Sequence, residues 1–240
     1  MSRDLQPRLT IRNSDDYNMP YSNPHGEFVL WNTRNTILTS HLSLVPDFDM
    51  FASNPASHRP LYHALLRAMS NGTILLSDTP DTETDLALLN AMTGRTSDNS
   101  TNVVRSSVSA VQLENRWFDL DLGSKESGKA HLAGAWDVGS GAGVIGAWNC
   151  REPGFQAVCQ DSLSFRDIKD LTNDNEGPFI VYPRGYSASL KGATVSLARP
   201  NEAFDLPFSL QEGECEAFIV SGLRTLDESR VAILGMQDKL

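Results

Sequence analysis

The chain has 240 residues and a mass of 26.3 kDa, and its 40 % apolar and 21 % charged residues are typical of one or two globular domains. Lys and Arg number 20 against 30 Asp and Glu, so the net charge of −10 argues against binding to a nucleic-acid backbone. No apolar run approaches the roughly 20 residues of a membrane-spanning helix, and the N-terminal residues MSRDLQPRL lack the apolar segment of a secretory signal. We therefore expect a cytoplasmic protein with no membrane or nucleic-acid partner.

The first part of the chain, up to about residue 95, alternates short apolar runs with longer amphipathic runs. Strands are predicted at residues 8–12, 41–45 and 73–77, and helices at residues 27–39, 59–69 and 82–92, the first of which could instead be a partly helical crossover. A capping box that opens at Thr82 is predicted to begin the last helix, and Gly94 to end it. The strands recur about every 30 residues, as in βα units. Because a whole (β/α)8 barrel needs about 250 residues, the sequence predicts either a small open sheet or the end of a barrel.

The second part, residues 96–240, has the pattern of antiparallel β structure, with short apolar runs separated by turn residues. Strands are predicted at residues 108–112, 117–122, 131–136, 143–149, 179–182, 193–197, 216–221 and 231–234. A sandwich packed on the α/β part is the natural assembly. Trp117, Trp136 and Trp148 are expected to fill the core of this sandwich, although exposed tryptophans could instead stack on sugar rings.

Acidic residues follow each of the three predicted parallel strands: Asp15 and Asp16 the first, Asp47 and Asp49 the second, and Asp78 the third. In barrels and open α/β sheets, ligands bind at the carboxyl ends of the strands, so these side chains are expected to face one site for a sugar or a metal. Paired carboxylates are what glycoside hydrolysis requires. The alternative is that they are ordinary loop and helix-capping residues.

The other motifs give weaker evidence for a functional site. The GxGxxG pattern at residues 141–146 runs directly into a predicted strand, so a hairpin turn is favoured over a phosphate-binding loop. The five histidines have no metal-ligand spacing, the three cysteines form no CxxC pair, and there is no GxSxG motif. We therefore predict no metal or cofactor, reduced thiols, structural or surface roles for the histidines, and a buried core position for Cys150.

Four segments resemble a known family, the raffinose synthase, seed imbibition protein and alkaline α-galactosidase group of glycoside hydrolase family 36. Residues 12–17, RNSDDY, resemble its strand-6 segment, and residues 46–51, PDFDMF, resemble its PDWDMF segment, with a similar helix at residues 57–68. Residues 76–81, LSDTPD, resemble its VSDKPG segment at strand 8, and residues 143–150, GVIGAWNC, resemble a strand of its C-terminal β domain. The order of the four segments matches as well.

The resemblance implies an α/β plus all-β fold: residues 1–95 as the last three βα units of a (β/α)8 barrel, and residues 96–240 as an antiparallel β-sandwich. It implies a retaining enzyme that hydrolyses α-galactosides or transfers galactose from a galactinol-like donor, without a cofactor. Asp16 corresponds to the family's acid/base and Arg12 to a sugar-contacting residue, and Asp47, Asp49 and Asp78 would shape the pocket.

The resemblance begins at the family's strand 6 and stops where family members continue, so both ends of the chain are expected to be cut. The family's nucleophile, an Asp on strand 4, has no counterpart in the chain, so the chain alone is expected to be inactive. Two other interpretations stay open. The chain could be a non-catalytic module that binds carbohydrate or protein, or an inactive product of a truncated gene model.

Overall fold

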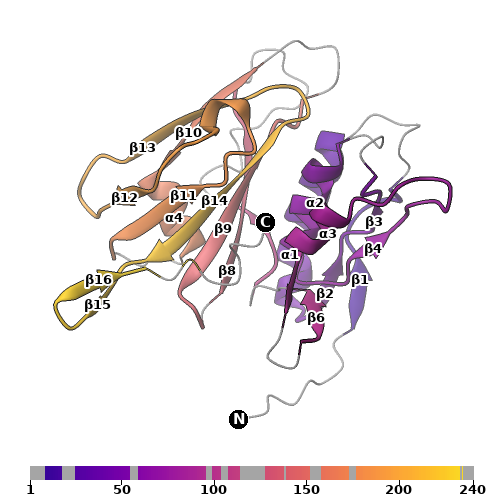
Figure 1. Cartoon of the computed structure of the whole chain (residues 1–240), viewed down its shortest axis with the longest axis horizontal. Coiled ribbons are helices and arrows are strands. Elements are labelled where there is room, and N and C mark those ends of the chain that lie inside the picture. The colour runs from indigo at the N-terminus through magenta and orange to yellow at the C-terminus, as the bar shows by residue number, and fades with distance from the viewer. Residues whose placement is uncertain are drawn as a thin grey trace.

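The computed structural model describes residues 9–17, 25–54, 59–95, 99–103, 108–113, 128–137, 139–151, 158–172, 177–232 and 234. It is a mixed helix and sheet structure in which antiparallel strands predominate. Figure 1 shows the α1 and α2 helices between the large sheet on one side and four short parallel strands on the other. None of the helices in the described ranges has the length and apolar character needed to cross a membrane.

The N-terminal region contains two parallel strand pairs and three helices. β1 (Thr10–Arg12) pairs with β2 (Val45–Asp47), and β3 (Met50–Phe51) pairs with β4 (Leu75–Leu76). The helices are α1 (His25–His41), α2 (Pro60–Ala68) and α3 (Leu86–Ala91). The register of the first pair sets Arg12 beside Asp47. It therefore brings two of the predicted site residues together at the ends of neighbouring strands.

Two predictions for this region are wrong. No strand runs from 41 to 45, because α1 continues to His41 and Ser43, at φ 56°, reverses the chain while the Leu44 N–H donates to the Thr39 carbonyl at 3.0 Å. The third helix begins later than predicted, because Asp85 is its N-cap and accepts from the Leu88 N–H at 2.9 Å. Thr82 instead closes a turn with Thr79. The short β3 strand, within the PDFDMF segment, was not predicted.

The C-terminal region is built on one six-stranded sheet of order β12-β11-β14-β9-β8-β7. Its members are β7 (Val111–Gln112), β8 (His131–Asp137), β9 (Ala142–Trp148), β11 (Phe179–Pro183), β12 (Ser196–Ala198) and β14 (Cys215–Gly222). All of their pairings are antiparallel. This order makes β14, far along the chain, a central strand between β9 and β11.

Smaller elements complete the fold. β10 (Cys159–Ser164) pairs with β13 (Asp205–Leu210), β5 (Thr93–Arg95) with β6 (Thr101–Val103), and β15 (Arg224–Leu226) with β16 (Ser229–Val231), with α4 (Phe165–Leu171) and the 3-10 helix η2 (Ala188–Leu190) between strands. Of these elements, β5, β6, β10, β13, β15, α4 and η2 were not predicted. The strand expected at residues 117–122 and the tryptophan Trp117 lie outside the described residues. The predicted hairpin at residues 141–146 is confirmed, with Gly141 at φ 67° in the turn between β8 and β9.

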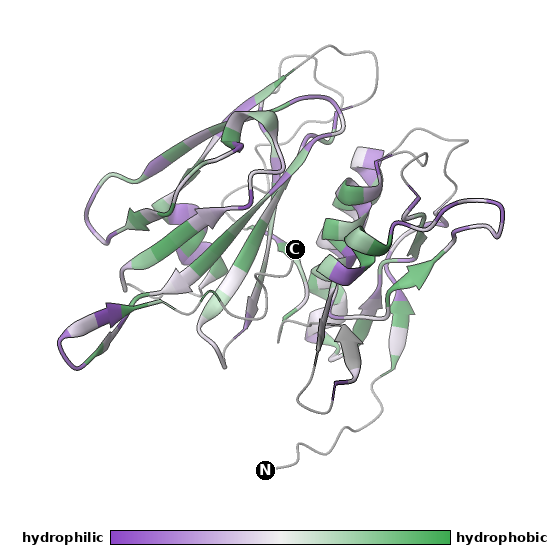
Figure 2. Ribbon diagram, in the orientation of Figure 1, coloured by the Kyte–Doolittle hydropathy of each residue, from purple (hydrophilic) through white to green (hydrophobic). Residues whose placement is uncertain are grey.

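The large sheet is buried on both faces, and the two faces differ in side-chain size. The face toward α1 and α2 carries mainly small residues such as Ala133, Ala135 and Ala217. The opposite face, toward β10, β13 and α4, carries larger ones such as Ile145 and Phe218. Small side chains on this face let α1 and α2 approach the sheet closely, because buried side chains pack without gaps against the elements that cover them. In Figure 2 the green of hydrophobic residues marks much of the central strands of this sheet.

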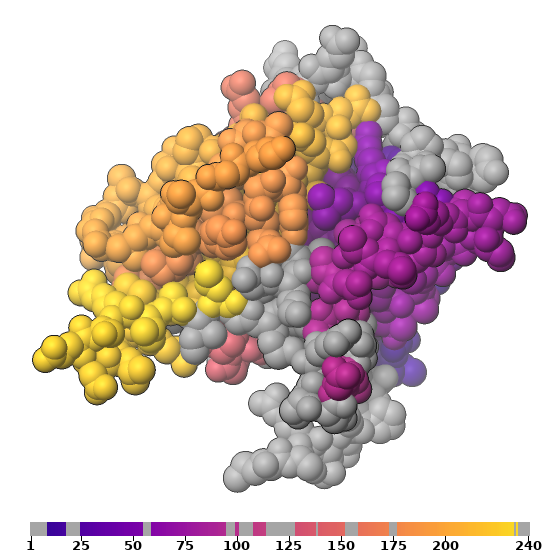
Figure 3. All heavy atoms as spheres, viewed as in Figure 1, coloured from indigo at the N-terminus to yellow at the C-terminus, as the bar shows by residue number. Residues whose placement is uncertain are grey.

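Trp148 joins the two regions. Contrary to the expectation that it fills the sandwich core, its fully buried ring packs in the cluster formed with α1 and α2. Its Nε1–H donates to the Tyr62 carbonyl at 3.1 Å, while the Tyr62 hydroxyl donates to the Asn149 carbonyl at 3.2 Å. In Figure 3 orange and yellow spheres of the C-terminal region lie directly against purple spheres of the N-terminal region. The N-terminal and C-terminal regions therefore share one hydrophobic core where they meet.

Candidate active site

One guanidinium holds three of the predicted acidic residues. Arg12, the last residue of β1, places Nη1 at 3.1 Å from Asp16 Oδ1 and 3.0 Å from Asp49 Oδ2, and Nε at 3.3 Å from Asp47 Oδ2. The β1–β2 register sets Arg12 beside Asp47, and Asp16 follows four residues after Arg12. Burial alone would lower the pKa of Arg12, but Asp49, Asp47 and Asp16 outweigh that effect and raise it.

The segment after β2 makes a tight acidic turn. Asp49 lies in the left-handed region at φ 62°, which Asp tolerates better than most residues. Its N–H donates to Asp47 Oδ1 at 2.8 Å, and its own carboxylate accepts from the N–H groups of Met50 at 2.8 Å and Tyr17 at 2.5 Å. With a side chain only 4 % exposed, Asp49 is a buried anchor between the two segments that carry Arg12 and Met50.

Asp78 lies apart from this cluster. Its Oδ1 accepts from the Ser53 N–H at 2.7 Å and the Asn54 N–H at 3.3 Å, and its Oδ2 accepts from the Ser53 hydroxyl at 2.6 Å. Burial raises the pKa of Asp78, but these hydrogen bonds and one from Thr84 outweigh it and lower the pKa. Asp78 thus ties the loop after β4 to the loop after β3, and its predicted role in substrate binding stays a prediction.

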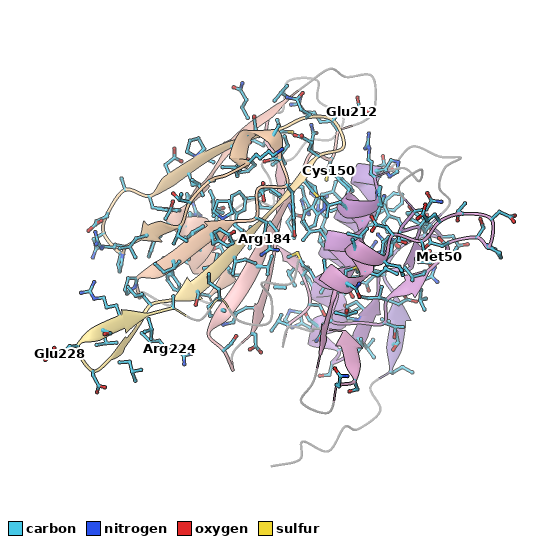
Figure 4. All side chains as sticks on the ribbon, viewed as in Figure 1. Met50, Cys150, Arg184, Glu212, Arg224 and Glu228 are labelled. Atoms are coloured by element: carbon cyan, nitrogen blue, oxygen red, sulfur yellow. The ribbon has the colours of Figure 1, made fainter. Side chains whose placement is uncertain are left out.

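An open pocket of about 680 Å³ lies over the cluster. Its lining combines the charged residues Arg12, Asp16 and Asp49 with Tyr17 and the apolar residues Met50, Leu75 and Leu76. Figure 4 labels Met50 at this edge of the molecule, on the side of the parallel strands that lies away from the large sheet. Asp16 is the most open of its acidic residues, with a side chain 93 % exposed. A lining with both charged and apolar side chains suits a sugar, which has hydroxyl groups and apolar C–H faces.

The histidines form buried polar contacts that the sequence did not reveal. His25 Nδ1 lies 2.7 Å from His63 Nε2, His63 Nδ1 lies 3.0 Å from Arg67 Nη1, and His131 Nε2 lies 2.9 Å from the Thr33 hydroxyl. None of the described residues forms a cluster of three or more His, Cys, Asp or Glu that could hold a metal ion. Helical spacing of His63 and Arg67 was the available signal, but it is equally common on solvated helix faces.

Cys150 is buried, as predicted, at the junction of the two regions (Figure 4). Burial raises the pKa of its thiol to about 12, and the Tyr62 hydroxyl lies 3.5 Å from the sulfur. A protonated, enclosed thiol is a poor nucleophile. Cys150 is therefore a packing residue.

Comparison with solved structures gives the fold. A GH27 β-L-arabinopyranosidase from Geobacillus stearothermophilus has a TM-score of 0.52 and 11 % identity over 92 % of this chain and 46 % of the enzyme. A variant of that enzyme, in complex with arabinose, has a TM-score of 0.51 and 13 % identity over 88 % and 44 %. α-Galactosidase I from Mortierella vinacea has a TM-score of 0.50 and 14 % identity over 88 % and 52 %. The chain spans about half the length of these structures.

Comparison with protein sequences gives the family. No curated protein sequence matches the chain significantly. The family described as raffinose synthase or seed imbibition protein Sip1 matches residues 6–236, which include both strand pairs and the large sheet. The chain therefore belongs to the raffinose synthase and seed imbibition protein family.

Proposed function

We propose that this chain carries the acid/base side of an active site that processes α-galactosides, by hydrolysis or by galactosyl transfer from a galactinol-like donor. Its family and the α-galactosidase among its structural neighbours support this kind of chemistry. In this proposal the parallel strand pairs and their helices are the last βα units of a barrel. The antiparallel region is the sandwich that follows the barrel.

The observation that carries the proposal is the accessibility of Asp16 compared with the other carboxylates. Asp49 and Asp78 have both oxygens engaged by N–H or hydroxyl donors or by Arg12. Asp47 holds the Asp49 N–H with one oxygen and Arg12 with the other. Asp16 lines the pocket, stays exposed, and is held by Arg12 through Oδ1. It is therefore the carboxyl group best placed to exchange a proton with a sugar.

Asp16 would act in both steps of a retaining reaction. As an acid it gives its proton to the glycosidic oxygen while a second carboxylate forms a bond to the anomeric carbon, and the glycosidic bond breaks to release the leaving group as an alcohol. As a base it then takes a proton from a water or sugar hydroxyl, whose oxygen bonds to the anomeric carbon as the bond to the second carboxylate breaks. The two carboxyl groups must lie about 5–5.5 Å apart. Since Asp47, Asp49 and Asp78 are all engaged as acceptors, we propose that the nucleophile comes from a segment outside this chain.

The test is turnover by the purified chain. We expect no release of p-nitrophenol from p-nitrophenyl α-galactoside by the chain alone, because one half of the carboxyl pair is missing. Turnover that disappears in Asp16→Asn would show that the chain holds both groups and would contradict the missing nucleophile. Binding of methyl α-galactopyranoside should be detectable by NMR and should weaken at least ten-fold in Arg12→Met, with Arg199→Met, an exposed arginine paired with Glu202, as the control.

A second function, sugar binding without catalysis, is favoured by the same accessible carboxylate, Asp16, in the pocket lining. It predicts retention on an α-galactoside matrix without turnover. Stacking on Trp148 does not contribute to it, because that ring is fully buried between the regions.

A further inference from the structure

Arg67 lies directly behind the acidic turn, and its position is unusual for an arginine. It belongs to the last turn of α2 and is 1 % exposed. Its guanidinium carbon lies 4.7 Å from the ring centre of Phe28, 5.2 Å from that of Tyr17 and 5.7 Å from that of Phe51. Aromatic faces stabilise a cation, but burial of an arginine needs hydrogen-bond acceptors as well.

Those acceptors are main-chain carbonyls of the acidic turn. Arg67 Nη2 donates to the Met50 carbonyl at 2.7 Å, and Nε donates to the Asp49 carbonyl at 3.2 Å. The two carbonyls lie on either side of the Met50 Cα, and that of Asp49 belongs to the peptide group that directly follows the Asp49 Cα, whose φ is positive. Removal of Arg67 would leave these carbonyls without that donor and release a backbone conformation that is costly for a non-glycine residue.

His63 completes the support. Because a guanidinium only donates, His63 Nδ1 must accept from Arg67 Nη1, so neutral His63 carries its proton on Nε2 and donates it to His25 Nδ1. Burial, together with Arg67 and His25, lowers the pKa of His63 well below its usual value and keeps the ring neutral. The direction of each hydrogen bond from Arg67 to His25 is therefore fixed, because the guanidinium offers only donors.

We propose that Arg67 is a positioning residue of the pocket: it fixes the main chain of Asp49 and Met50 from behind and thereby holds the Asp49 carboxylate under Arg12. Arg67 does not line the pocket, whereas Arg12, Asp49 and Met50 do. Its effect therefore reaches the pocket through the turn. The consequence for sugar binding rests on the proposed function, but the effect on Arg12 does not.

The first experiment follows Arg12 without any ligand. The full chain is labelled with 15N at arginine Nε, and the Arg12 Nε–H signal is assigned from Arg12→Lys. We expect this signal to shift or broaden in Arg67→Lys and Arg67→Met, and to stay in place in Arg59→Lys. Arg59 flanks the N-terminus of the same helix and pairs with Glu212 at 2.9 Å, so it is a matched control. An unchanged Arg12 signal in folded Arg67→Lys would overturn the proposal.

Folding of each variant is checked by near-ultraviolet circular dichroism. If Arg67→Met does not fold, Arg67→Lys carries the same comparison, and His63→Leu, which removes both the third acceptor of Arg67 and the donor to His25, is the second variant. A merely structural role would lower the melting temperature but leave the Arg12 signal unmoved in the folded protein.

The second experiment titrates methyl α-galactopyranoside. If the wild type binds it, Arg67→Lys should weaken the affinity at least five-fold and Arg59→Lys less than two-fold. Equal affinity for wild type and Arg67→Lys would overturn the proposal even if the Arg12 signal had moved. If the wild type does not bind, the proposed function fails, and the Arg12 signal alone decides whether Arg67 positions the turn.

Discussion

The strands of the two regions differ in how completely other elements cover them. The large C-terminal sheet has helices on one face and β10, β13 and α4 on the other, so Ile145, Leu132 and Phe218 are fully buried. The parallel strands of the N-terminal region are covered by α1 and α2 on one face only (Figure 1), and Ile11, Leu75 and Leu76 on these strands stay exposed. Apolar strands of this kind normally face a partner. Hydrophobic burial is therefore more complete at the large sheet and its junction with the helices than at the parallel strands.

The largest effect should follow from breaking that junction. Trp148→Ala removes a fully buried indole and its hydrogen bond to Tyr62, so the free energy of unfolding should fall by about 3–5 kcal/mol. Urea unfolding followed by circular dichroism measures this loss. Trp31→Ala, which removes a half-exposed indole from α1, is the matched control and should cost far less. Equal losses in the two variants would contradict a shared core.

Acid should destabilise the same junction. Burial and nearby Arg34 lower the pKa of His131 to about 3, whereas the unfolded chain takes up that proton near pH 6.5. The unfolded state therefore binds more protons below pH 6.5, so stability is complete above that pH and falls by about 1.4 kcal/mol per pH unit below it. Buried His63, whose pKa is also lowered, adds to the slope.

Urea titrations between pH 7.5 and pH 5 measure this slope. His131→Gln should reduce this slope by about 1.4 kcal/mol per pH unit, the contribution of one proton. A slope that survives His131→Gln in full would show that this ring is not the source.

A smaller effect tests how closely the regions approach. A Cβ at Gly26, in the first turn of α1, would overlap the backbone oxygen of Cys150. Gly26→Ala must push the helix away from the sheet region, at a cost of about 1–3 kcal/mol in unfolding free energy. Gly128→Ala, where nothing lies within 4 Å, should change stability by less than about 1 kcal/mol in either direction. Thermal melts of the two variants give the comparison.

The smallest effect on the free energy of unfolding is expected at the parallel strands, which helices cover on one face only. Leu76→Ala should change the free energy of unfolding by less than about 0.5 kcal/mol, because the side chain is 45 % exposed. Leu132→Ala, the same substitution at a buried position of β8, should cost about 2–5 kcal/mol. Leu76→Lys should also slow aggregation, measured by light scattering, since a charge blocks the pairing of an exposed strand edge. A large loss in Leu76→Ala would mean that this face is covered.

The candidate site could be predicted in part. Arg12 and Asp16 are four residues apart, and Asp47 and Asp49 follow the next parallel strand, so the common edge of the β1–β2 pair brings all four together. Asp78 also follows a strand, but the Ser53 and Asn54 donors hold both its oxygens. The support by Arg67 was not predictable, because an arginine in the last helical turn is typical of an exposed residue.

By itself the sequence determined α1 and α2, the hairpin at Gly141 and the acidic residues after the strands, because spacing and turn chemistry are local. Only the tertiary structure decided on which face of the large sheet Trp148 packs, which donors the Asp78 carboxylate accepts from, and how Arg67 and His63 are buried. These outcomes depend on donors and acceptors supplied by segments distant in the chain. An unpaired buried polar group costs about 1–3 kcal/mol, and local patterns do not record which distant group meets that need.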